Sequence, residues 1–156
     1  MLSERDKSFL SQIEGEGDIV SVQSLRCFMR KGDLLMALPY ARESALKTLS
    51  LYQPQRLVAK FYTHLATLWV YFGLAGLLRS IHLEIKESSP LVKLAGQNGL
   101  GFLLGNPNGP TRRIICLHRG TAGEWLVTKI GIQQAARQAV ANEARALRAL
   151  PEYLTG

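Results

Sequence analysis

The stretch from residue 99 to residue 150 constrains the fold most, because three strand-like runs are followed there by one helix-like run. The links between the runs are rich in glycine, proline and asparagine, which favour turns. Short links favour antiparallel neighbours, so the sequence predicts a three-stranded meander. The runs are GFLLG (101–105), RIICLHR (113–119) and WLVTK (125–129), and the links are NPNGP (106–110) and RGTAG (119–123).

The helix-like run begins near Ile132 and continues to about Leu150, where a proline ends it. One carboxylate, Glu143, falls on a stripe of this helix that is otherwise apolar. A carboxylate that faces a core is costly unless it is paired. Alternation along the last strand places Val127 and Lys129 on one face, and this strand leads directly into the helix. We therefore expect Lys129 to form an ion pair with Glu143.

A lysine on a strand followed by a glutamate on the next helix is the ion pair of the protein-kinase-like fold. The segments VTKIG (127–131) and NEARALRALP (142–151) resemble sequences of the bacterial aminoglycoside phosphotransferase-like family. The block LPYARESALKTLSLYQPQRLVAK (38–60) is similar to an N-terminal extension of some members. The alternative interpretation is a purely structural ion pair, because a strand lysine and a helical glutamate also meet by chance in α+β domains.

The resemblance implies that Lys129 holds the α- and β-phosphates of ATP or GTP and that Glu143 positions this lysine. It also implies that Val127 lines an adenine pocket and that a hairpin containing Asn108 and Gly109 covers the phosphates. Magnesium would accompany the nucleotide in a complete relative. No H-x-D-x-x-x-x-N segment and no metal-binding aspartates follow in the 156 residues, so the catalytic lobe of such a fold is missing. We therefore expect a nucleotide-phosphate clamp without kinase activity of its own.

The N-terminal half contains a further hairpin and a helix-like segment. Residues 19–29 and 34–39 have strand character and are separated by the turn-like sequence RKGD. This hairpin can form a small sheet of its own or extend the later one, and the sequence does not choose between these arrangements. Residues 40–52 have the composition of a helix.

The most apolar part of the chain is a predicted helix at about 55–81, in which residues 61–78 carry no formal charge. Its length makes a membrane span one alternative. Lys60 and His64 belong to a polar stripe along its first half, which favours a buried or interface helix over a span. The helix would then cover the missing C-terminal lobe or a partner. The alternative function is therefore a non-catalytic module for protein or membrane interaction.

The segment KESSP (86–90) is the predicted boundary between two units, after a short strand-like run at 81–85. We expect a helix-rich N-terminal extension with a hairpin over 1–86 and a truncated kinase-like lobe over 91–156. The predicted fold class is α+β, with a small antiparallel sheet and one packed helix in the second unit.

The net charge of +7, with a sequence pI near 9.7, permits binding of anions such as a nucleotide. Basic and aromatic residues are not interleaved on any predicted strand, so nucleic-acid binding is not expected. Cys27 and Cys116 each fall in an apolar run, which predicts reduced core residues. The charged N-terminus MLSERDKSF lacks an apolar signal region, and we expect the protein in the cytoplasm.

Overall fold

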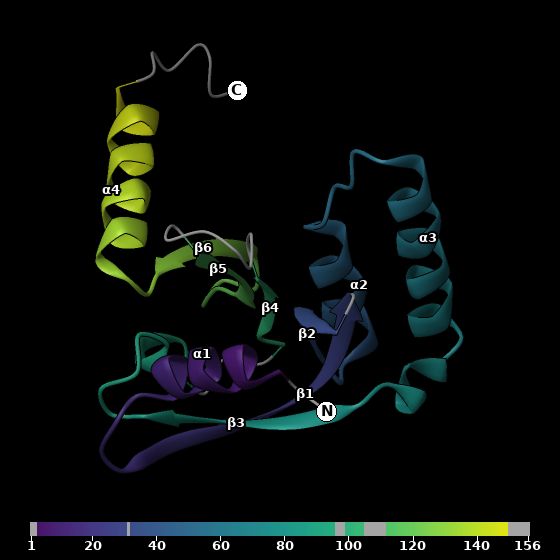
Figure 1. Ribbon diagram of the computed structural model, residues 1–156, viewed down its shortest axis with the longest axis horizontal. Helices are drawn as coiled ribbons and strands as arrows, with labels where there is room; N and C mark the ends of the chain where they lie inside the picture. The colour runs from purple at the N-terminus through teal and green to yellow at the C-terminus, as the bar shows by residue number, and fades with distance from the viewer. Residues whose placement is uncertain (1–2, 31, 96–98, 105–111, 150–156) are drawn as a thin grey trace.

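The fold is α+β, with one six-stranded antiparallel sheet in the order β3-β1-β2-β4-β5-β6 (Figure 1). This computed structural model describes residues 3–30, 32–95, 99–104 and 112–149. The strands are β1 (Ile19–Arg30), β2 (Asp33–Pro39), β3 (Ser80–Lys86), β4 (Gly101–Leu104), β5 (Arg113–Arg119) and β6 (Trp125–Gly131). The helices are α1 (Glu4–Glu14), α2 (Arg42–Ser50), α3 (Leu57–Tyr71) and α4 (Gln134–Arg148), with single 3-10 turns η1 (Leu74–Leu77) and η2 (Val92–Leu94).

Of the two arrangements that the sequence left open, the structure has the second: the N-terminal hairpin β1–β2 extends the β4–β5–β6 meander into one sheet. Two register pairs join the two halves, Met36 with Leu103 and Ala37 with Phe102. On the other side, β3 pairs along much of β1, which makes β3 an edge strand. Strands from both sides of the 86–90 segment therefore build one sheet.

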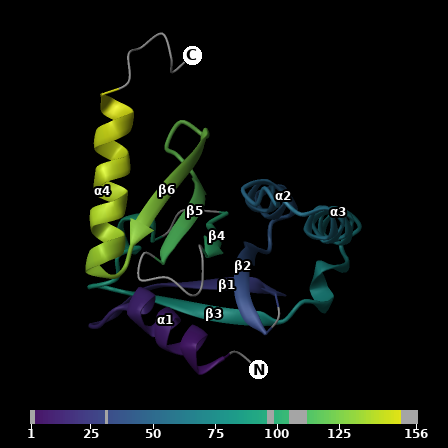
Figure 2. The same cartoon turned by 45° about the horizontal axis from the view of Figure 1, so that its top comes forward.

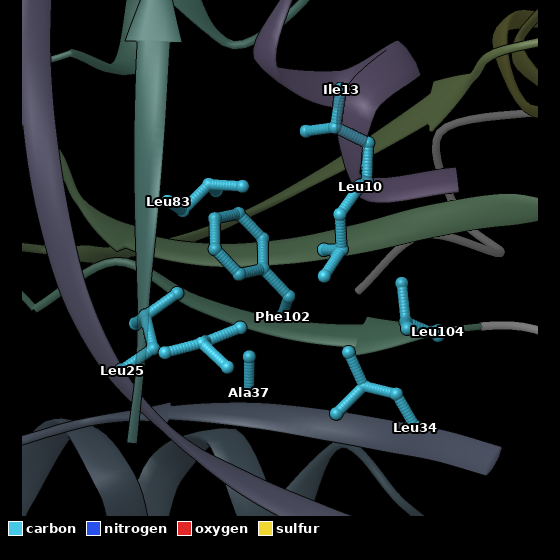
Figure 3. A pocket seen from close by; sticks show the side chains of 9 residues that line it. Leu10, Ile13, Leu25, Leu34, Ala37, Leu83, Phe102 and Leu104 are labelled. Atoms are coloured by element: carbon cyan, nitrogen blue, oxygen red, sulfur yellow. The ribbon is translucent and has the colours of Figure 1, made fainter. Parts of the chain in front are cut away.

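Helix α1 covers one face of the sheet, and its side chains enter the main core. Phe9 and Ile13 are buried there against residues of β1, β3 and β4, among them Leu83 and Phe102. This core contains a cavity of about 10 Å³. Figure 3 shows the apolar side chains that line it, among them Leu10 of α1. A space that small and apolar is a packing gap, since ligand sites are many times larger.

A buried ion pair fastens α1 at its first turn. The Asp6 carboxylate accepts hydrogen bonds from Arg112 Nη2 at 3.1 Å and from the backbone N–H of Leu34 at 2.9 Å. The Arg112 guanidinium carbon also lies 3.8 Å from the centre of the Phe9 ring. Both charged side chains are almost fully buried, so each depends on the other for compensation of its charge.

Helices α2 and α3 lie on the opposite face, over a second and smaller core cluster. Ala45 and Leu49 of α2 pack against Met36 of β2 and Leu103 of β4. Figures 1 and 2 show α2 beside the sheet and α3 on the outer side of α2.

The predicted helix at 55–81 is wrong beyond Tyr71. Gly73 adopts a left-handed conformation with φ of 77°, which suits glycine and stops α3. After η1 the chain pairs with β1 as strand β3, as the alternating sequence at 81–85 predicts. Within the residues that the structure describes, no helix is long and apolar enough to cross a membrane.

Candidate functional site

The predicted ion pair between strand and helix forms. Lys129 Nζ of β6 donates a hydrogen bond to Glu143 Oε1 of α4. Lys129 is the register partner of Ile115 on β5, and Ile115 packs against the cluster under α2. Since register partners share a face, α4 and α2 lie on the same side of the sheet, whereas Ile114 and its partner Ile130 face the core under α1.

A glycine at the end of β6 allows α4 to return onto the sheet. A Cβ atom at Gly131 would come within 2.4 Å of the backbone carbon of Ala136 and the backbone nitrogen of Arg137. Any other residue would push the first turn of α4 away from the strand. Ala136 is fully buried at this contact. The close approach therefore sets the position from which Glu143 reaches Lys129.

The structure adds a second cation that the sequence analysis did not assign to the site. Arg113 Nη1 of β5 donates to Glu143 Oε2 at 2.8 Å. Its strand pairs with β6 so that Arg113 lies opposite Gly131, two positions from the Ile115–Lys129 pair. Both basic side chains thus leave the same face of the sheet. The tight link between β5 and β6 is the sequence signal nearest to this register, but the pairing of Arg119 with Trp125 that fixes it comes from the structure.

The three charged groups form a cluster with two cations and one carboxylate, which gives a formal charge of +1. The hydrogen bond from Lys129, together with the positive charges of Lys129 and Arg113, lowers the pKa of Glu143 below its ordinary value of 4.5. Glu143 therefore stays ionised at neutral pH and is a poor proton acceptor. The side chains of Arg113 and Lys129 are 38% and 34% exposed, so their remaining N–H donors can meet an anion from solvent.

Val127 lies on the same face as Lys129, two residues earlier on β6, and is 51% exposed. Asn108 and Gly109, the predicted lid residues, lie outside the described residues.

Cys27, Cys116 and His118 are buried residues of the core and not parts of the charged site. Burial raises the pKa of Cys27 to about 11 and that of Cys116 to about 12, so neither thiol is a ready nucleophile. Both cysteines are free and buried, as the sequence predicted. His118 lies within 2.9 Å of Thr128 Oγ1 across the β5–β6 pair and is buried. Over the described ranges, no three His, Cys, Asp or Glu side chains gather into a possible metal site.

A second feature is the outward surface of α3. Successive helix residues turn by about 100°, and the exposed apolar residues of α3 other than Tyr71, together with the C-cap residue Phe72, fill one continuous arc of roughly 140°. Tyr71 lies outside this arc, with the guanidinium carbon of Arg42 4.4 Å from the centre of its ring. The opposite side faces α2, and only Ala66 and Val70 of this helix are fully buried. We call this arc the apolar face of α3; it consists of Leu57, Val58, Phe61, Tyr62, Leu65, Leu68, Trp69 and Phe72.

Comparison with known proteins leaves the chain without a match among family models, curated proteins or solved structures. The kinase-like interpretation therefore depends on the residues of the site itself.

Proposed function

We propose that β4–β6 and α4 form the nucleotide-phosphate clamp of a kinase-like phosphotransferase. The observation that carries this proposal is the ion pair between Lys129 and Glu143, on a strand and the helix that follows it. In phosphoryl transfer, a lysine held by a helical glutamate neutralises nucleotide phosphates. Arg113 adds a second donor with a planar guanidinium that suits phosphate oxygens.

In this proposal each residue of the cluster has one task. Lys129 and Arg113 bind phosphate oxygens of ATP or GTP, while Glu143 holds both cations in place and Val127 contacts the base. Both carboxylate oxygens of Glu143 accept hydrogen bonds from the two cations, so the proposal gives this residue a positioning role and assigns magnesium to other groups. Magnesium would supply further charge neutralisation at the phosphates, held by groups beyond this cluster. The clamp alone therefore binds and does not transfer phosphate.

Nucleotide binding tests the clamp directly. Titration of the purified chain with ATP in a calorimeter is expected to show binding that Lys129→Ala and Glu143→Ala each weaken by about tenfold, or roughly 1.4 kcal/mol. Arg145→Ala is the matched control, because the side chain of this exposed arginine on the same helix bonds to Asn142 and lies outside the charged cluster. Stronger ATP binding by Glu143→Ala would contradict the positioning role, since the carboxylate would then merely compete with the anion. Phosphate transfer by the isolated chain would contradict the non-catalytic assignment.

The second candidate function is an interaction module built on α3. The specific observation is the apolar face of α3, where Leu57 is 82% exposed and Phe61 is 66% exposed. Contiguous exposed apolar surface of this kind marks sites of association. Under this proposal Trp69→Glu abolishes association, while Lys129→Ala and Glu143→Ala change only stability. We place either activity in the cytoplasm and do not propose a nucleic-acid partner.

A further inference from the structure

We propose that the apolar face of α3 binds the surface of an anionic lipid bilayer, with the helix lying in the plane of the interface. This inference deepens the interaction role of α3 and does not depend on the phosphate clamp. It rests on the breadth of the apolar face, on its aromatic content and on the charges that surround it.

The breadth of the face favours a bilayer over a protein groove. A helix that enters a protein groove presents a narrow row of anchors at spacings of three and four residues. The apolar face of α3 instead spans more than a third of the helix circumference without a polar interruption. A bilayer interface accepts such a broad surface, because it has no fixed shape to match.

Exposed apolar side chains also follow the end of the helix. In η1, Leu74 is 47% exposed and Leu77 is 77% exposed, although Gly73 has already ended α3. Phenylalanine, tyrosine and tryptophan side chains occur along this surface, and tyrosine and tryptophan favour the boundary between apolar chains and headgroups.

The surrounding charges are of one sign. No Asp or Glu occurs between Glu43 and Glu84, a stretch that contains four lysine and arginine residues. Arg56 precedes α3, Lys60 lies about 60° around the helix from the apolar face, and Arg79 follows η1; all three are exposed. Cations around an apolar surface attract anionic headgroups.

The same charges argue against a second copy of the chain as the occupant. Two apolar faces packed together would bring Arg56, Lys60 and Arg79 of each copy close to their like-charged counterparts. Like charges in apposition disfavour an interface. The nearest upstream acid, Glu43, is already paired with Arg119 of β5 at 2.7 Å, so it does not offset this repulsion.

Vesicle binding by the whole chain tests the inference. The chain has two tryptophans, so Trp125→Phe leaves Trp69 of the apolar face as the only indole reporter. With phosphatidylcholine vesicles containing about 30% phosphatidylserine, we expect flotation with the vesicles, a blue shift of Trp69 emission, and quenching by brominated acyl chains. Pure phosphatidylcholine vesicles should bind at least about tenfold more weakly.

Matched variants separate this site from general attraction of a basic protein. Phe61→Ser with Phe72→Ser should reduce vesicle binding by at least about tenfold. Val22→Ser with Leu147→Ser is the control, since these residues are 54% and 58% exposed on β1 and α4, and it should bind normally. Equal binding by both double variants, or no flotation at all, would overturn the lipid assignment. Light scattering would then show whether the apolar face instead joins two copies, which would retain the interaction role and reject the bilayer.

Discussion

Helices α1 and α3 contrast in composition and in burial. α1 has the polar sequence ERDKSFLSQIE, yet it places Phe9, Ile13 and Asp6 in the interior. α3 has the apolar sequence LVAKFYTHLATLWVY, yet it buries only Ala66 and Val70 fully. The polar helix thus completes the main core, whereas the apolar helix leaves most of its circumference in contact with solvent.

The contrast shows that position in the fold, more than composition, decides what a helix buries here. α1 lies directly on the sheet and is fastened at one end by Asp6 and Arg112, whereas α2 lies between α3 and the sheet (Figure 1). An apolar side chain that folding leaves in water contributes nothing to the core. The exposure of the apolar face of α3 is the observation that supports the proposed association.

The largest expected effect comes from the buried pair that fastens α1. Arg112→Ala leaves the Asp6 carboxylate buried without its cation, and the expected loss in free energy of unfolding is about 3–5 kcal/mol. Chemical denaturation measures this loss. The control is Glu4→Ala, which removes the exposed pair with Lys7 in the same helix and should cost less than about 1 kcal/mol. An equally small loss for Arg112→Ala would mean that α1 is held by its apolar contacts alone.

Truncation of one apolar residue in each helix tests the contrast itself. Ile13→Ala removes a side chain that is 3% exposed in the main core, and should lower the free energy of unfolding by about 2–5 kcal/mol. Leu57→Ala on α3 should change it by no more than about 0.5 kcal/mol, because that side chain already contacts water. Thermal and denaturant unfolding of both variants would measure these two changes in the free energy of unfolding. A large loss for Leu57→Ala would place this face inside a folded interface and break the contrast.

The smallest effect on stability is expected at the ion pair that joins α4 to the sheet. The Glu143 carboxylate there is partly exposed, whereas the Asp6 carboxylate is buried. The pKa of Glu143 is lowered in the folded chain, so the ionised carboxylate stabilises folding above its ordinary pKa of 4.5. This contribution is lost as the pH falls through the lowered pKa. Unfolding measured at about pH 6 and about pH 3.5 should therefore show a smaller pH dependence for Glu143→Gln than for the parent chain. Identical pH dependence in the two proteins would show that the pair has no net effect on stability.

The sequence allowed the meander and its helix to be predicted because their signals are local. Strand-length apolar runs with turn-forming links led to β4–β6, and the position of Glu143 led to its pairing with Lys129. Arg113 was missed because its role depends on register across β5 and β6, which alternation within one strand does not supply. The long helix at 55–81 was overextended because the uncharged run continues to residue 78, whereas the left-handed conformation of Gly73 ends α3 and strand β3 begins at Ser80.

By itself, then, the sequence determined the α+β class, the β4–β6 meander with α4, and a charged pair between the last strand and that helix. Only the tertiary structure decided that the two hairpin regions share one sheet through the β2–β4 pairing, that Arg113 completes the charged cluster, and that α3 exposes its apolar face. The physical reason is the separation along the chain over which each kind of signal acts. Periodicity, turns and caps act over a few residues, whereas strand pairing between distant segments and the burial of a helix depend on what else occupies the space around them.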